Sequence, residues 1–207
     1  MKTPRHTRRA FSLVEMLIAL MITSTLLVAT MTAMHASFRA YKFTTDAAST
    51  HVVSRLVSHR VLSMIRTGDE FGPFPADVFA SAQNPVTSNF IEFLAFRDDL
   101  TATRRILRIE RREALSTEQG PFTLYVVERT FVNGTLTNTE QQPLLEGVSD
   151  AVFTLEYDIG PRLRRATFDL TVQPNDTRDT DLHTELQAPT IRLVSSIVPR
   201  RLELVDP

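Results

Sequence analysis

Glu15 is the residue whose chemistry most needs an explanation, because it is the only ionisable side chain between Phe11 and Met34. The rest of that stretch consists of Leu, Ile, Val, Met and Ala with scattered Ser and Thr. A charge at the centre of a membrane helix costs about 2.5–3.5 kcal/mol on the insertion scale. Either this stretch does not enter a membrane, or a cation from elsewhere pairs with Glu15 there.

A second group of potential ligands is a run of three carboxylates, Asp176, Asp179 and Asp181. Carboxylate oxygens are the donors that Ca²⁺ prefers. The run lacks the turn glycine and the closing glutamate of a calcium loop, and Arg178 lies inside it. We therefore expect a plain polar loop here, with these three residues as the remaining metal candidate, and no cofactor.

Motifs of catalysis are absent from the sequence. Two of the five histidines, His51 and His59, share a predicted helix, but their spacing of eight residues is too wide for an i, i+4 metal site. There is no Gly-x-Ser-x-Gly elbow, Walker phosphate loop or dinucleotide fingerprint. The sequence therefore predicts a protein that is not an enzyme.

Clusters of arginine raise the question of nucleic-acid binding. Acidic residues alternate with them, and strands that alternate Arg with aliphatic side chains usually have one face exposed to solvent and no nucleic-acid partner. The formal net charge of −1 gives no basic bias either. We therefore do not expect DNA as a partner. The clusters are Arg104 and Arg105, Arg111 and Arg112, Arg162, Arg164 and Arg165, and Arg200 and Arg201.

The stretch that contains Glu15 has the length of a membrane span. A helix needs about 20 mostly apolar residues to cross the hydrocarbon layer, and Phe11 to Met34 exceeds that length. Its hydroxyl groups can bond to helix carbonyls and so tolerate lipid. Four cations precede it, which places the N-terminus in the cytoplasm and the remainder outside. These cations are Lys2, Arg5, Arg8 and Arg9.

Two other interpretations of this stretch are a cleaved secretory signal and a buried helix of a soluble domain. A secretory signal is disfavoured because no Ala-x-Ala pair follows the stretch, which is long for such a signal and contains Glu15. A buried soluble helix is disfavoured because the stretch has no polar face. A membrane anchor therefore explains the sequence best.

The anchor is predicted to continue as one long helix. No proline or glycine occurs from Ala36 to Arg66, and Gly68 is expected to end the helix. On a helical wheel the apolar residues of 52–64 share one half, which predicts an apolar face laid on the following domain. The apolar set is Val52, Val53, Leu56, Val57, Val61 and Met64, and the polar set is Ser54, Arg55, Ser58, His59 and Arg66.

Short strands dominate the rest of the chain. The stretch from Gly68 to Ser88, which contains three prolines, is predicted to be loop-like. Asn133-Gly134 predicts a two-residue hairpin turn, and Gly160-Pro161 predicts a second hairpin. One helix followed by many strands predicts an α+β fold with an antiparallel sheet packed on the helix. The predicted strands are 90–96, 105–111, 122–132, 135–139, 152–157, 163–172 and 191–198.

The length of 207 residues leaves room for one anchor and one domain of ordinary size. The chain has no cysteine, so disulfides do not stabilise that domain. We therefore expect four segments in the chain. They are a basic segment at 1–10, a transmembrane helix at 11–35, an amphipathic continuation of the helix at 36–67, and an α+β head at 68–207.

The start of the apolar stretch carries a family resemblance. The segment from Arg9 to Leu20 resembles the signal of type IV prepilins and type II secretion pseudopilins. That signal has a short basic leader, a small residue before the cut, then Phe, a hydroxylated residue, two aliphatics and Glu. The chain matches it from Phe11 to Glu15. It departs at Ala10, where the family usually has Gly, and at Thr32, where major pilins often have Pro.

Two later segments resemble the larger minor subunits of the same family. Residues 143–158 are similar to a segment in which Gly-Val precedes a Phe-x-x-x-Tyr strand. Residues 197–201 are similar to a C-terminal strand that closes near an Arg. These similarities point to the J-type minor pseudopilin and the W-type minor pilin.

The resemblance implies that residues 1–10 are a basic leader peptide that is cleaved and that residues 11–35 serve for assembly as well as for membrane anchoring. A prepilin peptidase at the cytoplasmic face of the inner membrane would cut between Ala10 and Phe11, and the new amine of Phe11 would be N-methylated. Glu15 would pair with the N-terminal amine of a neighbouring subunit and set the axial register. The partners implied are other pilins or pseudopilins, in a type II secretion pseudopilus or a type IV pilus. The alternative is a membrane-anchored binding module whose head captures DNA or a secreted substrate.

Overall fold

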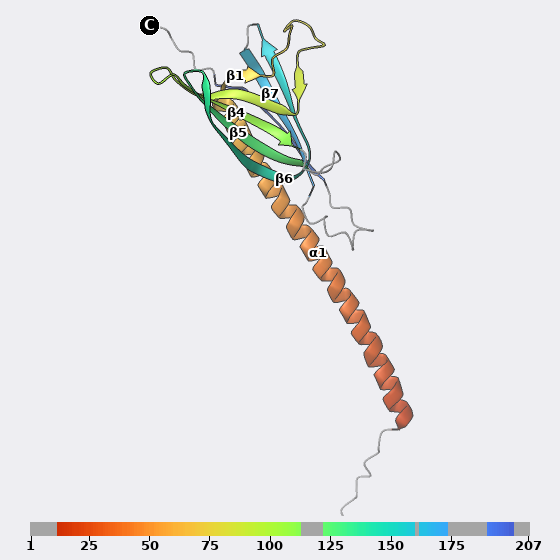
Figure 1. Cartoon of the computed structure of the whole chain (residues 1–207). Coiled ribbons are helices and arrows are strands. Elements are labelled where there is room, and N and C mark those ends of the chain that lie inside the picture. The colour runs from red at the N-terminus through yellow and green to blue at the C-terminus, as the bar shows by residue number, and fades with distance from the viewer. Residues whose placement is uncertain (1–11, 113–121, 160–161, 174–189, 201–207) are drawn as a thin grey trace, which may run out of the picture. The chain divides into compact units, whose positions relative to one another are not determined.

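The computed structural model describes residues 12–112, 122–159, 162–173 and 190–200. Within these ranges the chain forms one long helix, α1, followed by eight strands, β1 to β8 (Figure 1). A long apolar helix followed by an antiparallel sheet confirms the predicted α+β fold class. The chain divides into two compact units, Met1–Thr45 and Asp46–Pro207, so the last part of α1 belongs to the same unit as the sheet.

The helix α1 runs from Leu13 to Thr67, a length of 55 residues. The predicted end at Gly68 is confirmed, and the structure shows why a larger residue does not fit there. A Cβ on Gly68 would lie 2.4 Å from the ring of Phe93. The backbone N–H of Arg200 donates to the carbonyl of Arg66 at 2.8 Å, so a late segment of the chain satisfies one of the last carbonyls of the helix.

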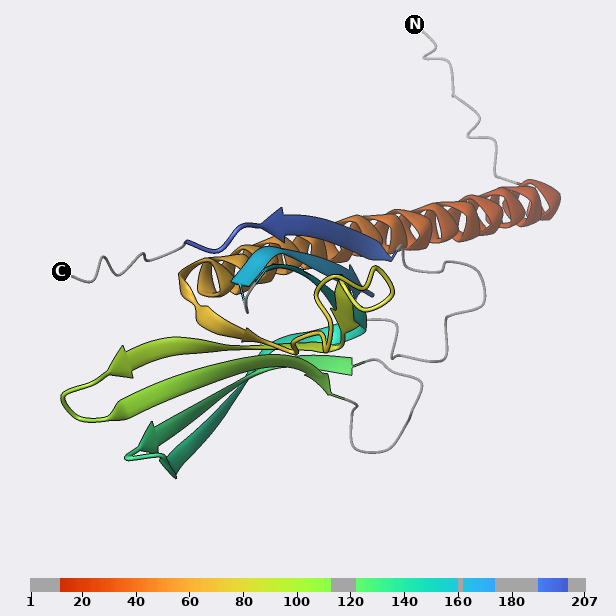
Figure 2. The ribbon, with the colours of Figure 1, turned by 90° about the horizontal axis from the view of Figure 1, so that it is seen from above.

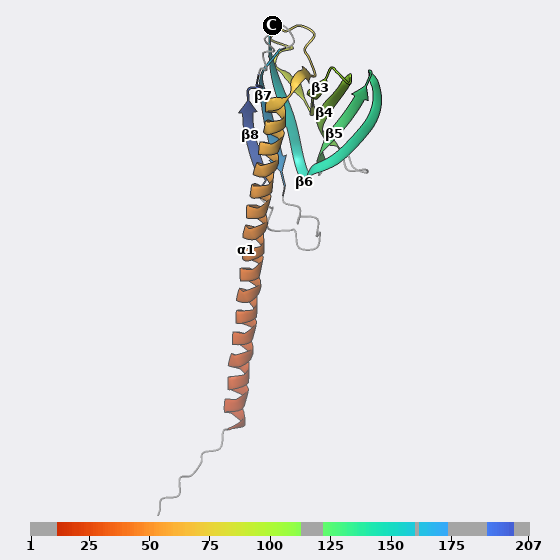
Figure 3. The same cartoon turned by 90° about the vertical axis from the view of Figure 1, so that its left-hand side faces the viewer.

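The strands form one antiparallel sheet in the order β1-β3-β4-β5-β6-β7-β8, with β2 paired to β6. Figures 2 and 3 show the long strand β6 curving between two parts of the sheet, with β3 to β5 on one side and β7 and β8 on the other. The strand bounds are β1 Asp69–Gly72, β2 Val86–Ser88, β3 Phe90–Asp98, β4 Thr103–Arg112, β5 Phe122–Val132, β6 Thr135–Asp158, β7 Arg162–Val172 and β8 Ile191–Ile197.

Most of the predicted strands agree with the structure. Those at 90–96, 105–111, 122–132, 163–172 and 191–198 match β3, β4, β5, β7 and β8 to within two residues at each end. The hairpin turn at Asn133-Gly134 is also confirmed. Both residues have positive φ, 51° and 77°, as a type I′ turn requires. The turn at Gly160-Pro161 lies outside the described residues.

The strand β6 is 24 residues long, so the prediction of separate strands at 135–139 and 152–157 was wrong. Its first half pairs with β5 and its second half pairs with β7. Register shifts on both sides near Val148 allow one strand to take part in both pairings. A local pattern does not show this, because the pairing partner changes along the strand.

The stretch 68–88 is not the plain loop that its prolines predicted, because it contains β1, which pairs with β3, and β2, which pairs with β6. The side-chain amide of Asn84 donates to the carbonyls of Val78 and Tyr157, each at 2.9 Å, and its Oδ1 accepts the Tyr157 N–H at 3.0 Å. The Tyr157 hydroxyl donates to the Pro73 carbonyl at 2.9 Å, and burial raises the pKa of that hydroxyl. The bond between Asn84 and Tyr157 spans 73 positions of the sequence, and the bond between Tyr157 and Pro73 spans 84. Local sequence patterns do not reveal contacts between residues so far apart.

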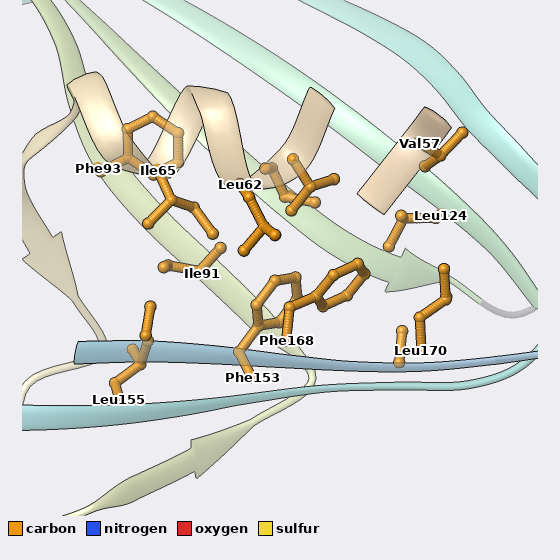
Figure 4. Close-up of a cluster of buried hydrophobic side chains, with 14 of the residues drawn as sticks. Val57, Leu62, Ile65, Ile91, Phe93, Leu124, Phe153, Leu155, Phe168 and Leu170 are labelled. Atoms are coloured by element: carbon orange, nitrogen blue, oxygen red, sulfur yellow. The ribbon is translucent and has the colours of Figure 1, made fainter. Parts of the chain in front are cut away.

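The hydrophobic core lies between the buried face of α1 and the inner side of the sheet (Figure 4). Phe153 of β6 and Phe168 of β7 stack with ring centroids 4.8 Å apart. Figure 4 shows both rings pointing toward Leu62 on α1. Burying side chains of this size stabilises the fold by about 1.5–3 kcal/mol each. The core therefore holds the last part of α1 to the strands.

The helix face that enters the core agrees with the predicted one only in part, because Val57 and Val61 are buried as expected but other members of the set are not. Val52 and Leu56, which were expected to face the sheet, are 65% and 69% exposed. Ser54 and Ser58, which were expected to face solvent, are buried, and their hydroxyls have no hydrogen-bond partner among the described residues. A helical wheel predicts the buried face from polarity alone, whereas close packing also requires side chains of a size that fits the available space. The buried helix residues are Ser54, Val57, Ser58, Val61, Leu62 and Ile65.

We predict that Ser58→Leu destabilises the head by about 1–3 kcal/mol, because a larger side chain overfills a packed site. The matched control is Leu56→Ser two positions earlier, which should change stability by no more than about 0.5 kcal/mol because its site is exposed. Urea unfolding of the full chain in detergent micelles measures both. A larger loss for Leu56→Ser than for Ser58→Leu would contradict the assignment of the buried face.

Candidate functional site

The candidate site is built on the first turn of α1. Ser12 precedes the helix, and its carbonyl accepts the N–H of Met16 at 3.2 Å. The N–H of Glu15 donates to Ser12 Oγ at 3.2 Å, and the N–H of Ser12 donates to Glu15 Oε2 at 3.0 Å. This reciprocal pair is a capping box, which satisfies N–H groups that the start of a helix leaves without partners.

The capping box holds the carboxylate of Glu15 at the N-terminal end of α1. Aligned peptide dipoles give that end a partial positive charge, which favours an anion. The bond to Ser12 uses Oε2, and a carboxylate has further lone pairs with which it can accept a second donor. The N–H that bonds to this carboxylate belongs to Ser12, the residue directly after Phe11. The carboxylate therefore lies close in sequence to the predicted new N-terminus.

Ser12 has a role that its residue type alone did not suggest. The sequence signal that identifies it is Ser-x-x-Glu directly before an apolar run, which is the pattern of a capping box. In the resemblance to prepilins Ser12 is only the hydroxylated residue after Phe11. The structure adds that its side chain and backbone fix the conformation of Glu15.

From Ser12 to Met34 the helix surface of the first unit is apolar apart from Glu15 and hydroxyl side chains. Every residue from Ser12 to Thr45 is exposed. Among the described residues α1 is the one helix that is long and apolar enough, by length and composition, to cross a membrane. A continuous apolar surface of this length is unfavourable in water and indicates contact with lipid or with other apolar helices.

Hydroxyl groups in this apolar surface are satisfied within the helix, as the sequence predicted. Thr23 Oγ1 donates to the Ala19 carbonyl at 2.7 Å, and Thr30 Oγ1 donates to the Leu26 carbonyl at 2.9 Å. A hydroxyl bonded in this way needs no water, so it does not exclude the helix from lipid. Equivalent bonds are made by Ser24, Thr25 and Thr32.

Several predicted site residues lie outside the described residues. They include the cleavage and methylation site, Ala10 and Phe11, and the calcium candidates Asp176, Asp179 and Asp181. Their roles remain predictions. Within the described ranges no group of three or more His, Cys, Asp or Glu side chains is arranged to hold a metal ion.

The described arginines of the clusters at 104–112 make ion pairs on the sheet. Arg108 donates to Glu110 at 2.5 Å and stacks over the ring of Phe90 at 3.7 Å, and Arg112 also donates to Glu110. Burial by itself would raise the pKa of Glu110, but the hydrogen bonds and charges of Arg108 and Arg112 outweigh it and lower the pKa. Arginines already paired with carboxylates attract phosphate less, so these clusters do not favour DNA binding. Further pairs are Arg104–Glu70, Arg105–Glu128 and Arg111–Asp150.

Comparison with known proteins gives one match. Residues 5–31 match the model of the prokaryotic N-terminal methylation motif, so this match includes Ala10, Phe11 and Glu15. This prepilin-type signal supports a relationship to type IV pilins and pseudopilins, and it indicates a structural subunit anchored in a membrane. Neither the curated proteins nor the solved structures contain a significant match to this chain.

We predict that Ser12→Ala weakens the first turn of α1 by about 0.5–2 kcal/mol, the usual effect of removing a capping hydroxyl. Amide exchange at residues 13–16 of the full chain in micelles should become faster. Ser12→Thr keeps the capping oxygen and serves as the matched control, with exchange close to that of the natural chain. Equal exchange in the natural chain and Ser12→Ala would show that the capping box does not hold the turn.

A pH-dependent effect is predicted for Glu110. Its folded pKa lies below its unfolded value near 4.5, so its contribution is present above that value and is lost as the pH falls through the folded pKa. Glu110→Gln should therefore lower stability at pH 7, and the difference from the natural chain should shrink in acid. Urea midpoints measured from pH 7 down to about pH 3 test this, with exposed Glu146→Gln as the control. A difference that stays constant with pH would show that Glu110 acts through packing alone.

Proposed function

We propose that this chain is a minor pilin-like structural subunit of a type II secretion pseudopilus or a type IV pilus. The observation that carries the proposal is the N-terminal methylation motif at residues 5–31, which includes the start of a fully exposed apolar helix. The similarity of residues 143–158 and 197–201 to the larger minor subunits favours a J-type minor pseudopilin or a W-type minor pilin.

Processing would begin while the basic leader is still attached. The leader cations Lys2, Arg5, Arg8 and Arg9 favour a cytoplasmic N-terminus and a head on the other side of the inner membrane. A prepilin peptidase would cut between Ala10 and Phe11 and leave the apolar helix in place as the anchor. Ala10 is small enough to replace the usual Gly before the cut. N-methylation of the new amine of Phe11 leaves it a cation.

Glu15 would pair with the amine of a neighbouring subunit. A typical hydrogen bond contributes about 0.5–1.5 kcal/mol net, so the capping bond to Ser12 is smaller than the cost of a charge in hydrocarbon, which reaches about 2.5–3.5 kcal/mol at the centre of a membrane helix. Two unit charges about 4 Å apart attract by about 4 kcal/mol at an effective dielectric constant of 20. The attraction of a cationic amine from a neighbouring subunit is therefore large enough to balance this cost. Pairing at one position along the helix also fixes the axial register between the subunits.

Lateral contact would come from the apolar surface of α1. In the membrane this surface contacts lipid, and in an assembled fibre it would contact the same surface of other subunits. Neither environment provides water, so the bonding of Thr23 and Thr30 to helix carbonyls suits both. The charge pair of Glu15 then distinguishes one register from others that bury similar apolar area.

We predict that Glu15→Ala leaves the head folded and the leader still removed, but abolishes co-purification with other pilins. Glu15→Gln should behave in the same way, because it keeps the shape and loses the charge. Glu146→Ala, which removes an exposed carboxylate from the head, is the control and should assemble normally. Co-purification from solubilised membranes measures the effect. Unchanged assembly of Glu15→Ala would remove the proposed role of Glu15.

N-terminal sequencing of the mature chain tests the processing step separately. The expected first residue is N-methylated Phe11, with the apolar helix retained. A soluble product that begins near residue 36, or a chain with its leader intact, would contradict the proposed class of protein and not only the role of Glu15.

A further inference from the structure

The aromatic residues of α1 are gathered in one short segment. The helix has 55 residues, and its aromatic side chains are Phe38, Tyr41 and Phe43. They begin about one helical turn after Met34, where the apolar stretch ends. The three side chains are exposed, by 58%, 72% and 37%. Packing against the described part of the chain does not explain this cluster, because its rings remain exposed there.

The same segment carries the first permanent cation after the basic N-terminal segment. This cation is Arg39, and no acid occurs between Glu15 and Asp46. The side chain of Arg39 has no hydrogen-bond or ion-pair partner among the described residues, whereas Lys42 interacts within the chain. An exposed guanidinium therefore lies beside exposed aromatic rings. This combination is typical of the boundary between a membrane and water.

The length of the helix places this segment at that boundary. An α-helix rises about 1.5 Å per residue, so Leu13 to Met34 extends about 33 Å, slightly more than the hydrocarbon core of about 30 Å. Phe38 lies about 6 Å past the end of this stretch, and each headgroup layer is about 5–8 Å thick. Helix side chains lean toward the N-terminus, which is the membrane side here, so the rings of Tyr41 and Phe43 reach back toward the headgroups.

The large side chains of this segment occupy one side of the helix, since successive residues are turned by about 100°. The other side carries small residues. Helices that meet in a membrane usually do so through small side chains, which let their backbones approach. The small side therefore suits a neighbouring helix, and the large side suits lipid. The large set is His35, Phe38, Arg39, Tyr41, Lys42 and Phe43, and the small set is Ala36, Ser37, Ala40 and Thr44.

We propose that residues 35–43 form an interfacial belt that binds anionic phospholipid in the leaflet on the side of the head. Arg39 bonds to the lipid phosphate, because a guanidinium donates two parallel hydrogen bonds to phosphate oxygens. Phe38, Tyr41 and Phe43 lie among the headgroups and the upper acyl chains. The interfacial belt fixes the depth of α1 in the membrane. This inference rests on the membrane anchoring in the proposed function.

Continuity and charge select lipid as the occupant of the interfacial belt. The belt directly follows the apolar stretch of the same helix, so headgroups surround it whenever that stretch is in a membrane. A segment of the head would cover it only by displacing those headgroups. A second copy presents the same cation, and two Arg39 side chains repel each other.

Tryptophan fluorescence of the full chain in vesicles tests the proposal. Because the chain has no tryptophan, Phe38→Trp introduces a single indole and keeps the position aromatic. The vesicles contain phosphatidylcholine and phosphatidylglycerol in equal parts, and each lipid in turn carries bromine, which quenches the indole on contact. Quenching should show phosphatidylglycerol enriched about fivefold around the indole, the factor expected for one Lys or Arg at an anionic surface.

Two arginine variants of this reporter chain make the test specific. Arg39→Gln should bring the ratio of the two lipids close to one. Arg55→Gln is the matched control, because Arg55 is exposed on the same helix but about 24 Å farther along, and it should leave the ratio unchanged. Loss of the preference in both variants, or in neither, would overturn the proposal.

A second reporter, Leu20→Trp, separates failure of the interfacial belt from failure of the membrane anchor. Quenching of Leu20→Trp but not of Phe38→Trp would mean that water or another segment of this chain surrounds the belt, and only the present proposal would be overturned. Absence of quenching in both reporters would contradict the membrane anchoring as well. Weak quenching of Phe38→Trp by both lipids that strengthens as the protein is diluted in lipid would identify a second copy as the occupant, which also overturns the proposal.

Discussion

An ionised carboxylate in an apolar helix must be compensated, and this requirement governs the N-terminal part of the protein. The capping box with Ser12 supplies part of the compensation by bonding one oxygen of Glu15 to the backbone. That contribution is smaller than the cost of placing the charge in hydrocarbon. The helix start is thus well defined within one chain, and under the proposed function a cation from another chain completes its charge balance. In the proposed assembly the same residue orders the first turn and selects the neighbour.

Further along α1, some apolar side chains are buried within the chain while others remain exposed. In the second unit the helix buries Val61 and Ile65 completely against the sheet, and it exposes Val52 and Leu56. The two buried serines show that the sheet accepts small side chains on this face, even though their hydroxyls lack partners among the described residues. An exposed aliphatic set opposite a complete core is consistent with the helix meeting other subunits beyond the membrane stretch as well.

Features set by neighbouring residues could be predicted from the sequence. The end of α1 follows from Gly68, the β5–β6 turn from Asn133-Gly134, and the strand positions from runs of β-branched and aromatic residues. The capping role of Ser12 was not predicted, although the local Ser-x-x-Glu spacing indicates it. The assembly role of Glu15 stays a prediction, and the predicted cleavage residues lie outside the described ranges.

Features set by distant residues could not be predicted. The strands β1 and β2 exist because β3 and β6 provide pairing partners, and the segment between them is fastened by Asn84 to Tyr157. The continuity of β6 depends on two different neighbours. The buried face of α1 depends on the space that the sheet leaves for each side chain, so a polarity pattern identified Val57 and Val61 but placed Val52, Leu56 and the two buried serines on the wrong faces.

The unsatisfied surfaces of the molecule are of two chemical kinds, and this limits what can bind each. The apolar surface of the first unit has its backbone bonded within the helix, so it distinguishes partners only by shape, apolar area and the charge of Glu15. The edge of β8 that pairs with no described residue has the opposite character, because it presents main-chain donors and acceptors with a fixed spacing. A helix cannot satisfy that edge, and an isolated strand cannot satisfy the membrane surface, because its own backbone groups would lack partners in lipid. A partner that satisfies one of these surfaces therefore leaves the other available.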